Sequence, residues 1–365
     1  MATVSRSMDA NSRSIGMPDG WMARARLPLL LCALIVAVSV LAFMADPLTQ
    51  RRVIMCLIWM IAVIGLQVFM GNSGVLNFST AAFMGVGAYA SALTTMPVDV
   101  KALFLPDLPV WLAGMQMPTY LGPFLALALG MGIAVVIGWP LMRLTGIAAG
   151  IATFSVMLIG NVVLGNWTSV TGGQTSLTGV PTFVSLPVAA GFAMVAVIIA
   201  HLFAQSRICL PLQASREDEV AARAAGTPVN RLRLLAFVLG SGLGALSGAL
   251  MGHFQGTLRV ETFYFDTAFL LVAMLVLGGM RSISGAVVGT LAVSFLTEVL
   301  RKVEAGIDLP FGAHLAAPAG LGDLIVAGGM LLILIFRPLG ITGGRELDAI
   351  WRQPGRKTKR EDTNA

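Results

Sequence analysis

Charged residues are scarce in this chain of 365 residues. Asp, Glu, Lys and Arg together make up 12% of it, about half of the ~25% that is usual in soluble domains. Hydrophobic residues make up 56%, and a bilayer can solvate that much apolar surface whereas water cannot. Lipid offers the backbone no hydrogen bonds, so each crossing segment must be helical. Long uncharged runs, rather than short alternating segments, argue against a membrane β-barrel. The composition predicts an all-α polytopic membrane protein.

Cysteine is also rare. The three cysteines are Cys32, Cys56 and Cys209, and the first two lie inside apolar runs. Their odd number and irregular spacing give neither a disulfide framework nor a metal-ligand pattern. We therefore expect no metal site, and we interpret these cysteines as small residues of the protein interior.

Several signatures of catalysis and energy coupling are missing. The chain has no G-x-x-x-x-G-K-[ST] phosphate loop, so we expect no ATPase site of its own. Glu298 and Asp323 lie near the ends of apolar runs, whereas an ion-driven carrier usually has a carboxylate at mid-membrane. The sequence shows no convergent ionisable groups of the kind that form active sites, so no catalytic residue is predicted. These absences favour a conduit that is powered by another protein.

Ten apolar runs approach the ~20 residues that a helix needs to cross a bilayer. The first is too long for a signal-peptide core, and no clean cleavage site follows it. The predicted domains are an N-terminal tail (1–26), a transmembrane permease domain (27–340) and a C-terminal tail (341–365). The predicted spans cover residues 27–45, 51–70, 76–95, 120–142, 146–165, 187–205, 233–252, 266–280, 283–300 and 321–337.

The distribution of Lys and Arg predicts the orientation. If the N-terminus is cytoplasmic, 18 of the 24 basic residues fall on the cytoplasmic side and 6 on the other side. This asymmetry follows the positive-inside rule and places both termini in the cytoplasm. It also explains the net charge of +6 without a nucleic-acid partner. The last ~20 residues are polar and basic, which favours contact with anionic headgroups.

The segment 207–233 is the most polar stretch between two apolar runs. It holds five arginines and three consecutive acids, Glu217 to Glu219. Ser215, with Asp218 three residues later, is predicted to cap a short helix that Gly226 ends. Thr227 and Pro228 are predicted to start the next helix. Charge and capping leave two interpretations open: a cytoplasmic docking element, or merely a well-formed loop.

Polar side chains and glycines enter the membrane together after residue 71. Such residues suit a small-molecule pathway because they hydrogen-bond a solute and allow close backbone approach. Hydrogen bonding between helices is the equally weighted alternative. The candidate pathway residues are Gly74, Asn77, Ser79, Thr80, Gly85 and Tyr89.

Glycines recur every fourth residue in the run 233–252, and we interpret them mainly as a helix-packing face. They are Gly240, Gly244, Gly248 and Gly252. Two long connections lie on the extracytoplasmic side. Residues 96–119 contain four prolines and are expected to form an irregular loop. Residues 166–186 carry no charge and are suited to lie at the bilayer surface or dip into it.

Taken together, the motifs of this sequence resemble those of a known family. The resemblance covers residues 50–345 in collinear order, and the order and spacing of its motifs carry it. The chain is similar to LivM-type permease subunits of bacterial ABC importers for branched-chain amino acids. The motifs are AAFMGVGAY at 81–89, RLTG from Arg143, ATFS at 152–155, TGG-x-x-x-LTGVP at 171–181, SREDEVAARAAGTPVNRLRLLAFVLGSGLGALSGALMG at 215–252, GGMRSISGAVVGT at 278–290 and FRPLGITG at 336–343.

The resemblance implies an inner-membrane importer of several subunits. This chain would pair with a LivH-like permease, two cytoplasmic ATPase subunits and a periplasmic solute-binding protein. ATP would be used by the partners, and this chain would bind no cofactor. The segment 206–232 would couple ATPase closure to permease opening. The residues implied in coupling are Ser215, Arg216, Glu217, Asp218, Glu219, Ala222, Arg223 and Gly226.

The chain departs from the family pattern at two places. Residues 77–80 read NFST, and Met280-Arg281 stand in the segment after Gly279. Relatives also carry urea, short amides or other amino acids, and neutral Asn, Ser and Thr suit a zwitterion or an uncharged amide. Transport of branched-chain amino acids is the favoured function. The first alternative is a permease of the same family for those other solutes. A stand-alone carrier or channel is the less favoured alternative.

Overall fold

The computed structural model describes residues 20–304, 307–308, 314–315, 328, 340–343 and 346. Within these residues the chain is mostly helical, and the strands form two short antiparallel pairs, β1 with β2 and β3 with β4. Eight of the described helical segments are long and apolar enough to cross a membrane. The predicted all-α membrane class is confirmed. Except for residue 328, the tenth predicted span, 321–337, lies outside the described residues.

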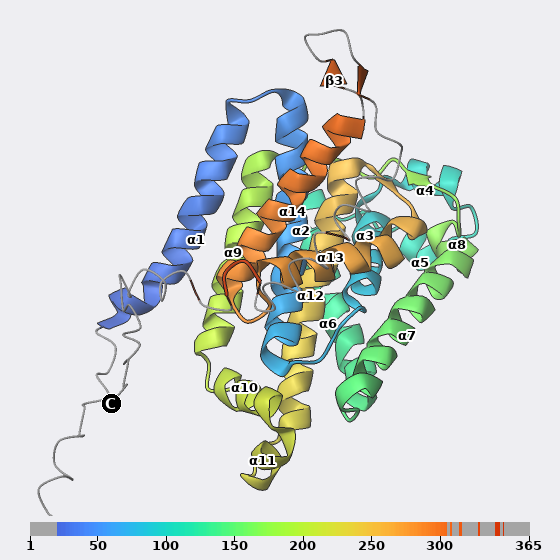
Figure 1. Ribbon diagram of the computed structural model, residues 1–365. Helices are drawn as coiled ribbons and strands as arrows, with labels where there is room; N and C mark the ends of the chain where they lie inside the picture. Colours follow the sequence, from blue (N-terminus) through green and yellow to red (C-terminus); the bar gives the residue numbers. More distant parts are fainter. Residues whose placement is uncertain are drawn as a thin grey trace, which may run out of the picture.

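The elements follow one another along the chain with short connections (Figure 1). They are α1 (Gly20–Phe43), α2 (Pro47–Leu66), the π-helix η1 (Gln67–Gly71), α3 (Thr80–Thr95), α4 (Val98–Phe104), α5 (Val110–Ala113), η2 (Thr119–Leu121), α6 (Gly122–Leu141), α7 (Gly146–Asn166), α8 (Thr168–Thr171), β1 (Leu177–Thr178), α9 (Leu186–Gln205), α10 (Cys209–Glu217), α11 (Glu219–Ala224), α12 (Val229–Gln255), β2 (Thr257–Leu258), η3 (Val260–Phe263), α13 (Phe265–Gly278), α14 (Ile283–Glu304), β3 (Ile307–Asp308) and β4 (His314–Leu315).

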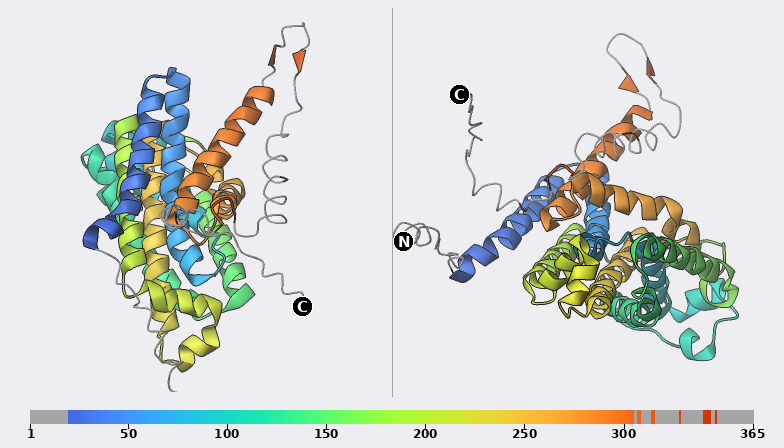
Figure 2. Two further views of the ribbon diagram at one scale, coloured as in Figure 1. Left: turned by 60° about the vertical axis from the view of Figure 1, so that its left-hand side comes forward. Right: turned by 60° about the horizontal axis from the view of Figure 1, so that its bottom comes forward.

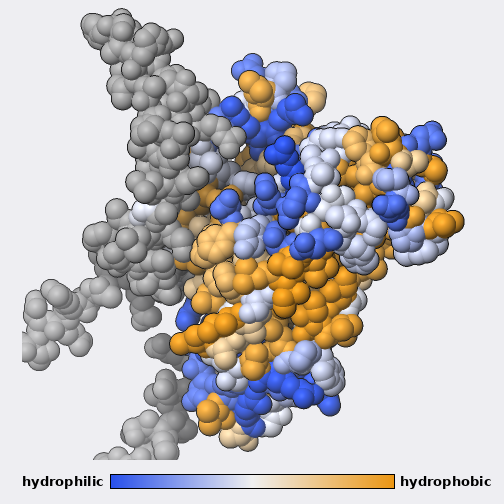
Figure 3. All heavy atoms as spheres, turned by 90° about the vertical axis from the view of Figure 1, so that its right-hand side faces the viewer, coloured by the Kyte–Doolittle hydropathy of each residue, from blue (hydrophilic) through white to orange (hydrophobic). Residues whose placement is uncertain are grey.

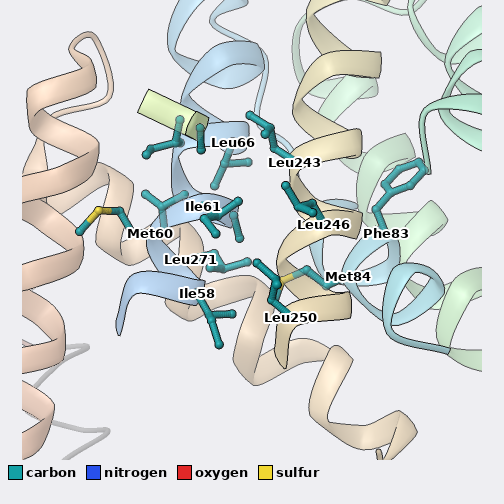
Figure 4. Close-up of a cluster of buried hydrophobic side chains, with 14 of the residues drawn as sticks. Ile58, Met60, Ile61, Leu66, Phe83, Met84, Leu243, Leu246, Leu250 and Leu271 are labelled. Atoms are coloured by element: carbon teal, nitrogen blue, oxygen red, sulfur yellow. The ribbon is translucent and has the colours of Figure 1, made fainter. Parts of the chain in front are cut away.

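Helix α12 forms the centre of the bundle and packs against α2, α3 and α6. The core consists of aliphatic side chains from these helices, with Leu271 from α13 beside Ile58 and Ile61 of α2 (Figure 4). Phe69 and Phe83 each meet Phe237 of α12 edge-on, at ring-centroid distances of 5.3 and 5.7 Å. Because apolar burial gives little drive between helices inside lipid, close van der Waals packing holds this centre together.

The predicted glycine face of α12 lies where the backbones approach most closely. A Cβ atom at Gly248 would sit 1.9 Å from the Met84 carbonyl oxygen of α3, and one at Gly240 would sit 2.5 Å from that of Gly65 in α2. Gly244 faces Thr80 and Phe83, while Gly252 faces Leu258 of β2. Any side chain at Gly248 would therefore force α12 and α3 apart.

The third predicted span begins later than the sequence indicates. Residue 76 was expected as its first position, but α3 starts at Thr80 and has only 16 residues. Gly74 has φ +73°, and the backbone is non-helical from there to Ser79. Asn77 binds the Ser79 amide and hydroxyl through Oδ1, at 3.0 and 2.7 Å. This local competition with the helix backbone delays its start.

The proline-containing connection 96–119 is more regular than predicted. Pro97, Pro109 and Pro118 immediately precede α4, α5 and η2. The ring fixes φ near the helical value and lacks an N–H group that a helix start would leave unpaired, so proline can begin a helix. Lys101 of α4 is buried and donates from Nζ to the Leu112 and Met115 carbonyl oxygens, which joins α4 to the segment after α5. The prediction of an irregular loop was therefore wrong.

The two ends of the bundle are distinct in Figure 1: α4, α5 and α8 lie at one end, and α10 and α11 at the other. The charge count assigns α10 and α11 to the cytoplasm, so we name these the extracytoplasmic and cytoplasmic ends. Between them, a band of apolar side chains is flanked by polar ones (Figure 3). Helix α7 contributes exposed apolar residues to the lipid-facing surface, among them Ile151, Ile159 and Val162. The long helices lie side by side (Figure 2), and the chain is a multi-pass membrane protein.

Candidate functional site

Helices α10 and α11 form a bent pair at the cytoplasmic end. Asp218 lies at the bend, and its carboxylate accepts a hydrogen bond from the Ala221 amide at 2.9 Å. Asp218 is therefore the N-cap, and the prediction of Ser215 was wrong. Ser215 lies inside α10, buried, and its hydroxyl donates to the Leu212 carbonyl oxygen at 2.7 Å. A Ser-x-x-Asp spacing permits either residue to cap a helix, and the geometry selects the second.

Gly226 ends α11 as predicted. It has φ +81°, and its amide donates to the Arg223 carbonyl oxygen at 2.9 Å, while the Thr227 amide donates to that of Ala222 at 3.1 Å. These two bonds are those of a Schellman motif, which favours glycine at this position. The next helix, α12, begins at Val229, one residue later than predicted, with Pro228 at its N-cap.

Glu219 connects α11 to the central helix α12. Its carboxylate accepts from Arg223 at 2.7 Å and from Arg233 of α12 at 2.8 Å. Burial opposes the ionisation of Glu219, but the hydrogen bonds from Arg223 and Arg233 hold its pKa below the usual value. Arg223 also donates to the Asn230 side chain at 2.8 Å. A rotation of α11 therefore requires the Glu219 contacts to break or α12 to follow.

Helix α10 connects to the end of η1. Arg216 donates from Nη1 to the Gly71 carbonyl oxygen at 2.6 Å, and Gln213 donates to the Asn72 side-chain oxygen at 2.9 Å. A Cβ atom at Gly71 would sit 2.2 Å from the Met280 carbonyl oxygen in the α13–α14 turn. Gly71 therefore lies between α10 and that turn, and π-helical segments such as η1 often occur at functional sites.

Glu217 connects α10 to the same turn. It pairs with Arg216 at 2.9 Å and with Arg281 at 3.5 Å. The hydrogen bond from Arg216, and then the charge of Arg281, lower the pKa of Glu217. Arg281 belongs to Met280-Arg281, one of the two places at which the chain departs from the pattern of the family that it resembles. The departure thus gives α10 an ionic contact with the α13–α14 turn.

Residues near the C-terminus complete this cytoplasmic junction. The Glu346 carboxylate accepts hydrogen bonds from the Ile283 amide at 2.8 Å and the Ser284 hydroxyl at 2.8 Å, at the start of α14. The Thr342 hydroxyl donates to the Gly278 carbonyl oxygen at 2.8 Å. Sequence reasoning assigned 341–365 to a tail and missed Glu346. The available signal was an acidic residue three positions after Gly343 in the ITGG segment.

The candidate pathway residues do not converge on one cavity. Asn77, Ser79 and Thr80 are buried and bond to one another at the start of α3, with Asn77 donating to the Thr80 hydroxyl at 3.3 Å. Gly85 lies against Leu164 and Phe263. Gly74 lines one of the two cavities described below, and Tyr89 lines the other. Among the described residues, Asn77, Ser79 and Thr80 thus form the hydrogen-bonded start of helix α3.

The first cavity, which we name the cytoplasmic cavity, has a volume of about 610 Å³. It lies between the non-helical segment 73–78, the first turns of α7, and α10 to α12. Its polar wall contains Ser73, Ser215, Arg216, Glu219 and Arg233. Non-helical backbone at the depth of the membrane is tolerated where it lines such a cavity. The cavity therefore explains how residues 74–78 can remain extended.

The second cavity is an apolar crevice of about 730 Å³ between α3, α6 and α7. Apolar side chains such as Phe83, Leu125 and Val156 line it. The Tyr89 hydroxyl belongs to its wall and has no hydrogen-bond partner within the described part of the chain. The crevice offers no charged or strongly polar partner to a zwitterion.

At the extracytoplasmic end, His253 holds three segments together. Its Nδ1 donates to the Pro181 carbonyl oxygen at 2.8 Å, because a carbonyl only accepts, and its Nε2 accepts from the Ser91 hydroxyl of α3 at 2.7 Å. Phe183 packs against the imidazole at a centroid distance of 5.0 Å. These contacts fix the uncharged segment 166–186 over α3 and α12. Within this segment, β1 also pairs with β2.

The residues that the structure describes contain no cluster of three or more His, Cys, Asp or Glu side chains that could hold a metal ion. Cys56 and Cys209 are buried, and Cys32 is partly exposed. The site is thus built from arginines, carboxylates and backbone carbonyl groups. Such groups can transmit movement and attract anions.

Comparison with known proteins agrees with this architecture. Residues 49–335 match the family described as the permease component of branched-chain amino acid transport systems. The chain is 26% identical to the high-affinity branched-chain amino acid transport system permease protein LivM of Escherichia coli, over 86% of this chain and 74% of that protein. It is 28% identical to the probable LivM of Methanocaldococcus jannaschii over 41% and 46% of the two chains. It is also 27% identical to E. coli LivH over 40% and 42%. No solved structure matches significantly.

Proposed function

Since the chain belongs to the family of permease components of branched-chain amino acid transport systems, we propose that it is the permease subunit of an ABC importer. It would carry branched-chain amino acids across the inner membrane without an ATPase site or bound cofactor of its own. Similarity to LivM supports this substrate class, because LivM relatives are named for it over most of this chain's length. The chain acts as a transport subunit rather than as an enzyme.

The proposed assembly contains a second, LivH-like permease, two cytoplasmic ATPase subunits and a periplasmic solute-binding protein. The similarity of one chain to both LivM and LivH supports a homologous permease partner. The binding protein would deliver the solute at the end where His253 fixes the segment 166–186. The ATPases would act at the opposite end.

The observation that carries the proposal is the construction of α10 and α11. Val220 is 80% exposed and Leu210 73% exposed, while Arg216, Glu217 and Glu219 bind other parts of this chain. An apolar side chain on an otherwise polar cytoplasmic end is suited to a partner's groove. We therefore assign docking to Val220 and neighbouring alanines, and force transmission to the charged residues. Movement of α11 would pass to α12 through Glu219, and movement of α10 to η1 and α14 through Arg216 and Glu217.

A charge at Val220 tests the docking assignment. In Val220→Asp, the carboxylate would have to lose its water inside the interface, so we expect ATPase copurification and ATP-driven uptake to fall about tenfold or more. Val110→Asp is the matched control, because Val110 is equally exposed (89%) at the extracytoplasmic end. It should retain the ATPases. Normal uptake and copurification in Val220→Asp, at normal membrane levels, would reject docking at α11.

Substrate and energy source are tested separately in proteoliposomes. The reconstituted assembly should take up leucine, isoleucine and valine only with ATP and binding protein present. Uptake of urea or a short amide in place of leucine would favour the other solute class within the family. Uptake by this chain alone, without ATP, would instead favour a stand-alone carrier or channel.

A further inference from the structure

Arg233 is a buried cation with spare hydrogen-bonding capacity. The residue is 3% exposed, and its Nη2 donates to Glu219. Its Nε and Nη1 groups find no acceptor among the described residues. Arginine stays charged and carries five N–H donors, and unpaired buried donors are costly. Arg233 forms part of the wall of the cytoplasmic cavity, so an acceptor that enters this cavity is the missing partner.

The N-terminus of α7 contributes to the same cavity. Gly146 and Ile147 line it, and the N-cap residue Thr145 makes no side-chain capping bond. The first amides of a 21-residue helix and its dipole therefore favour a negative charge there. The charged side chains in the wall are Arg216, Glu219 and Arg233, so positive charge is in excess. The polar part of the cavity is suited to an anion.

The remaining wall is apolar and leads outward. Leu76 is 49% exposed, Ile151 61% and Ile147 84%, and all three line the cavity. From there the apolar surface of α7 continues through Ile159 and Val162 into the lipid-facing band. At the same end, the Arg143 guanidinium lies over the exposed Trp139 ring at 5.9 Å, an arrangement typical of the headgroup level. The ligand thus needs an anionic group at the cytoplasmic surface and a long apolar part.

We propose that the cytoplasmic cavity binds one anionic phospholipid. Its phosphate accepts hydrogen bonds from Arg233 and from the amides at the start of α7, and one acyl chain follows Leu76, Ile147 and Ile151 onto the outer face of α7. The phosphate is the acceptor for the Nε and Nη1 groups of Arg233, which Glu219 leaves without a partner. Because Arg233 also holds α11 through Glu219, the lipid stabilises the element to which we assign docking, although binding itself is independent of that assignment.

Lipid retention tests the proposal directly. The full-length chain is purified in detergent, delipidated, and titrated with phosphatidylglycerol or phosphatidylcholine, and bound lipid is counted by native mass spectrometry. Both lipids carry the phosphate, but the arginines of the cavity wall repel the choline cation of phosphatidylcholine, so we expect one phosphatidylglycerol to bind at least about tenfold more tightly than phosphatidylcholine. Arg233→Gln should remove this preference. Arg231→Gln, an exposed arginine in the same helix, should keep it.

Two further arms separate other outcomes. If Arg233→Gln does not fold, Ile151→Glu places a repelling acid at the exposed mouth without removing core packing, and it should also abolish the preference. Inorganic phosphate and leucine are titrated at the same concentrations by thermal shift. Equal binding of both lipids, an unchanged preference in Ile151→Glu, or a thermal shift from phosphate or leucine that matches phosphatidylglycerol would each overturn the proposal.

Discussion

At the extracytoplasmic end, the described segments are joined largely by contacts that involve no carboxylate: the β1–β2 pair, the bonds of His253, and the carbonyl groups that accept from Lys101. One ion pair, Arg52 with Glu298, joins α2 to α14 there. At the cytoplasmic end, arginine–carboxylate pairs link α11 to α12 and α10 to the α13–α14 turn, and Arg216 links α10 to the Gly71 carbonyl oxygen of η1. The two ends use different chemistry to tie loops to the same central helices.

This difference has a mechanical consequence. Breaking a buried neutral bond such as His253 to Ser91 leaves two unpaired groups. Arg216 and Arg223 each contact two acceptors, and Glu217 and Glu219 each face two arginines. Exchange among such partners is less costly than complete loss. The cytoplasmic end is therefore the end that can be rearranged, and the other end acts as the fixed point.

The largest effect is expected from Arg233→Leu, which breaks the cytoplasmic network at its buried member. Glu219 would lose its most buried partner, and removal of one partner from a buried pair costs about 3 kcal/mol or more. We expect a lower free energy of unfolding and faster hydrogen exchange in residues 219–226, with unchanged exchange in 177–184. Hydrogen-exchange mass spectrometry in detergent measures both.

Arg231→Leu is the control for that experiment, since Arg231 is exposed two residues earlier in α12. It should leave exchange in α11 unchanged. The double variant Glu219→Leu/Arg233→Leu should regain part of the lost stability, because no buried unpaired charge remains and the exposed Arg223 keeps its bond to Asn230. Equal acceleration of exchange at both ends in Arg233→Leu would contradict the separation of the two networks.

A smaller effect is expected at the fixed end from His253→Phe. The variant leaves the Ser91 hydroxyl and the Pro181 carbonyl oxygen without their partner, at a cost of about 2 kcal/mol. Exchange should accelerate in residues 179–184 and stay unchanged in α11. Adding Ser91→Ala should recover part of the loss, because it removes one of the two unpaired groups. A double variant that loses the sum of both single effects would contradict this account.

Much of the architecture could be predicted from the sequence because it depends on local composition. Apolar runs define helices that lipid requires, the excess of basic residues defines orientation, and Gly226 occupies a conformation that glycine favours. Prediction failed where two local options compete. The spacing of Ser215 and Asp218 suits either as a cap, and Asn77 can either continue a helix or bond to Ser79. Such choices depend on a few tenths of a kcal/mol or on tertiary packing.

The candidate site was predicted only in part because its partners are distant in sequence. The acids and arginines of 216–223 were recognised from local charge, but sequence gave no sign that Arg216 binds the Gly71 carbonyl oxygen, 145 residues away. Arg233 was counted only for orientation, and Glu346 lay in an assumed tail. The burial of Arg233 and its unfilled donors emerge only when α7, α10, α11 and α12 are placed together.

The last and smallest effect concerns the pH dependence of stability at the cytoplasmic end, which arises from the ionisation of Glu219. The folded-state pKa of Glu219 is lowered below its ordinary value of 4.5 by Arg223 and Arg233 against the opposing effect of burial. Its contribution to stability is therefore complete above pH 4.5 and is lost as pH falls through the folded-state pKa. The difference in melting temperature between the wild type and Glu219→Gln should stay constant from pH 8 to 5 and narrow below 4.5. A Glu219→Gln difference that narrows near neutral pH would mean that the arginines raise rather than lower this pKa, which would remove the electrostatic basis for distinguishing the two ends.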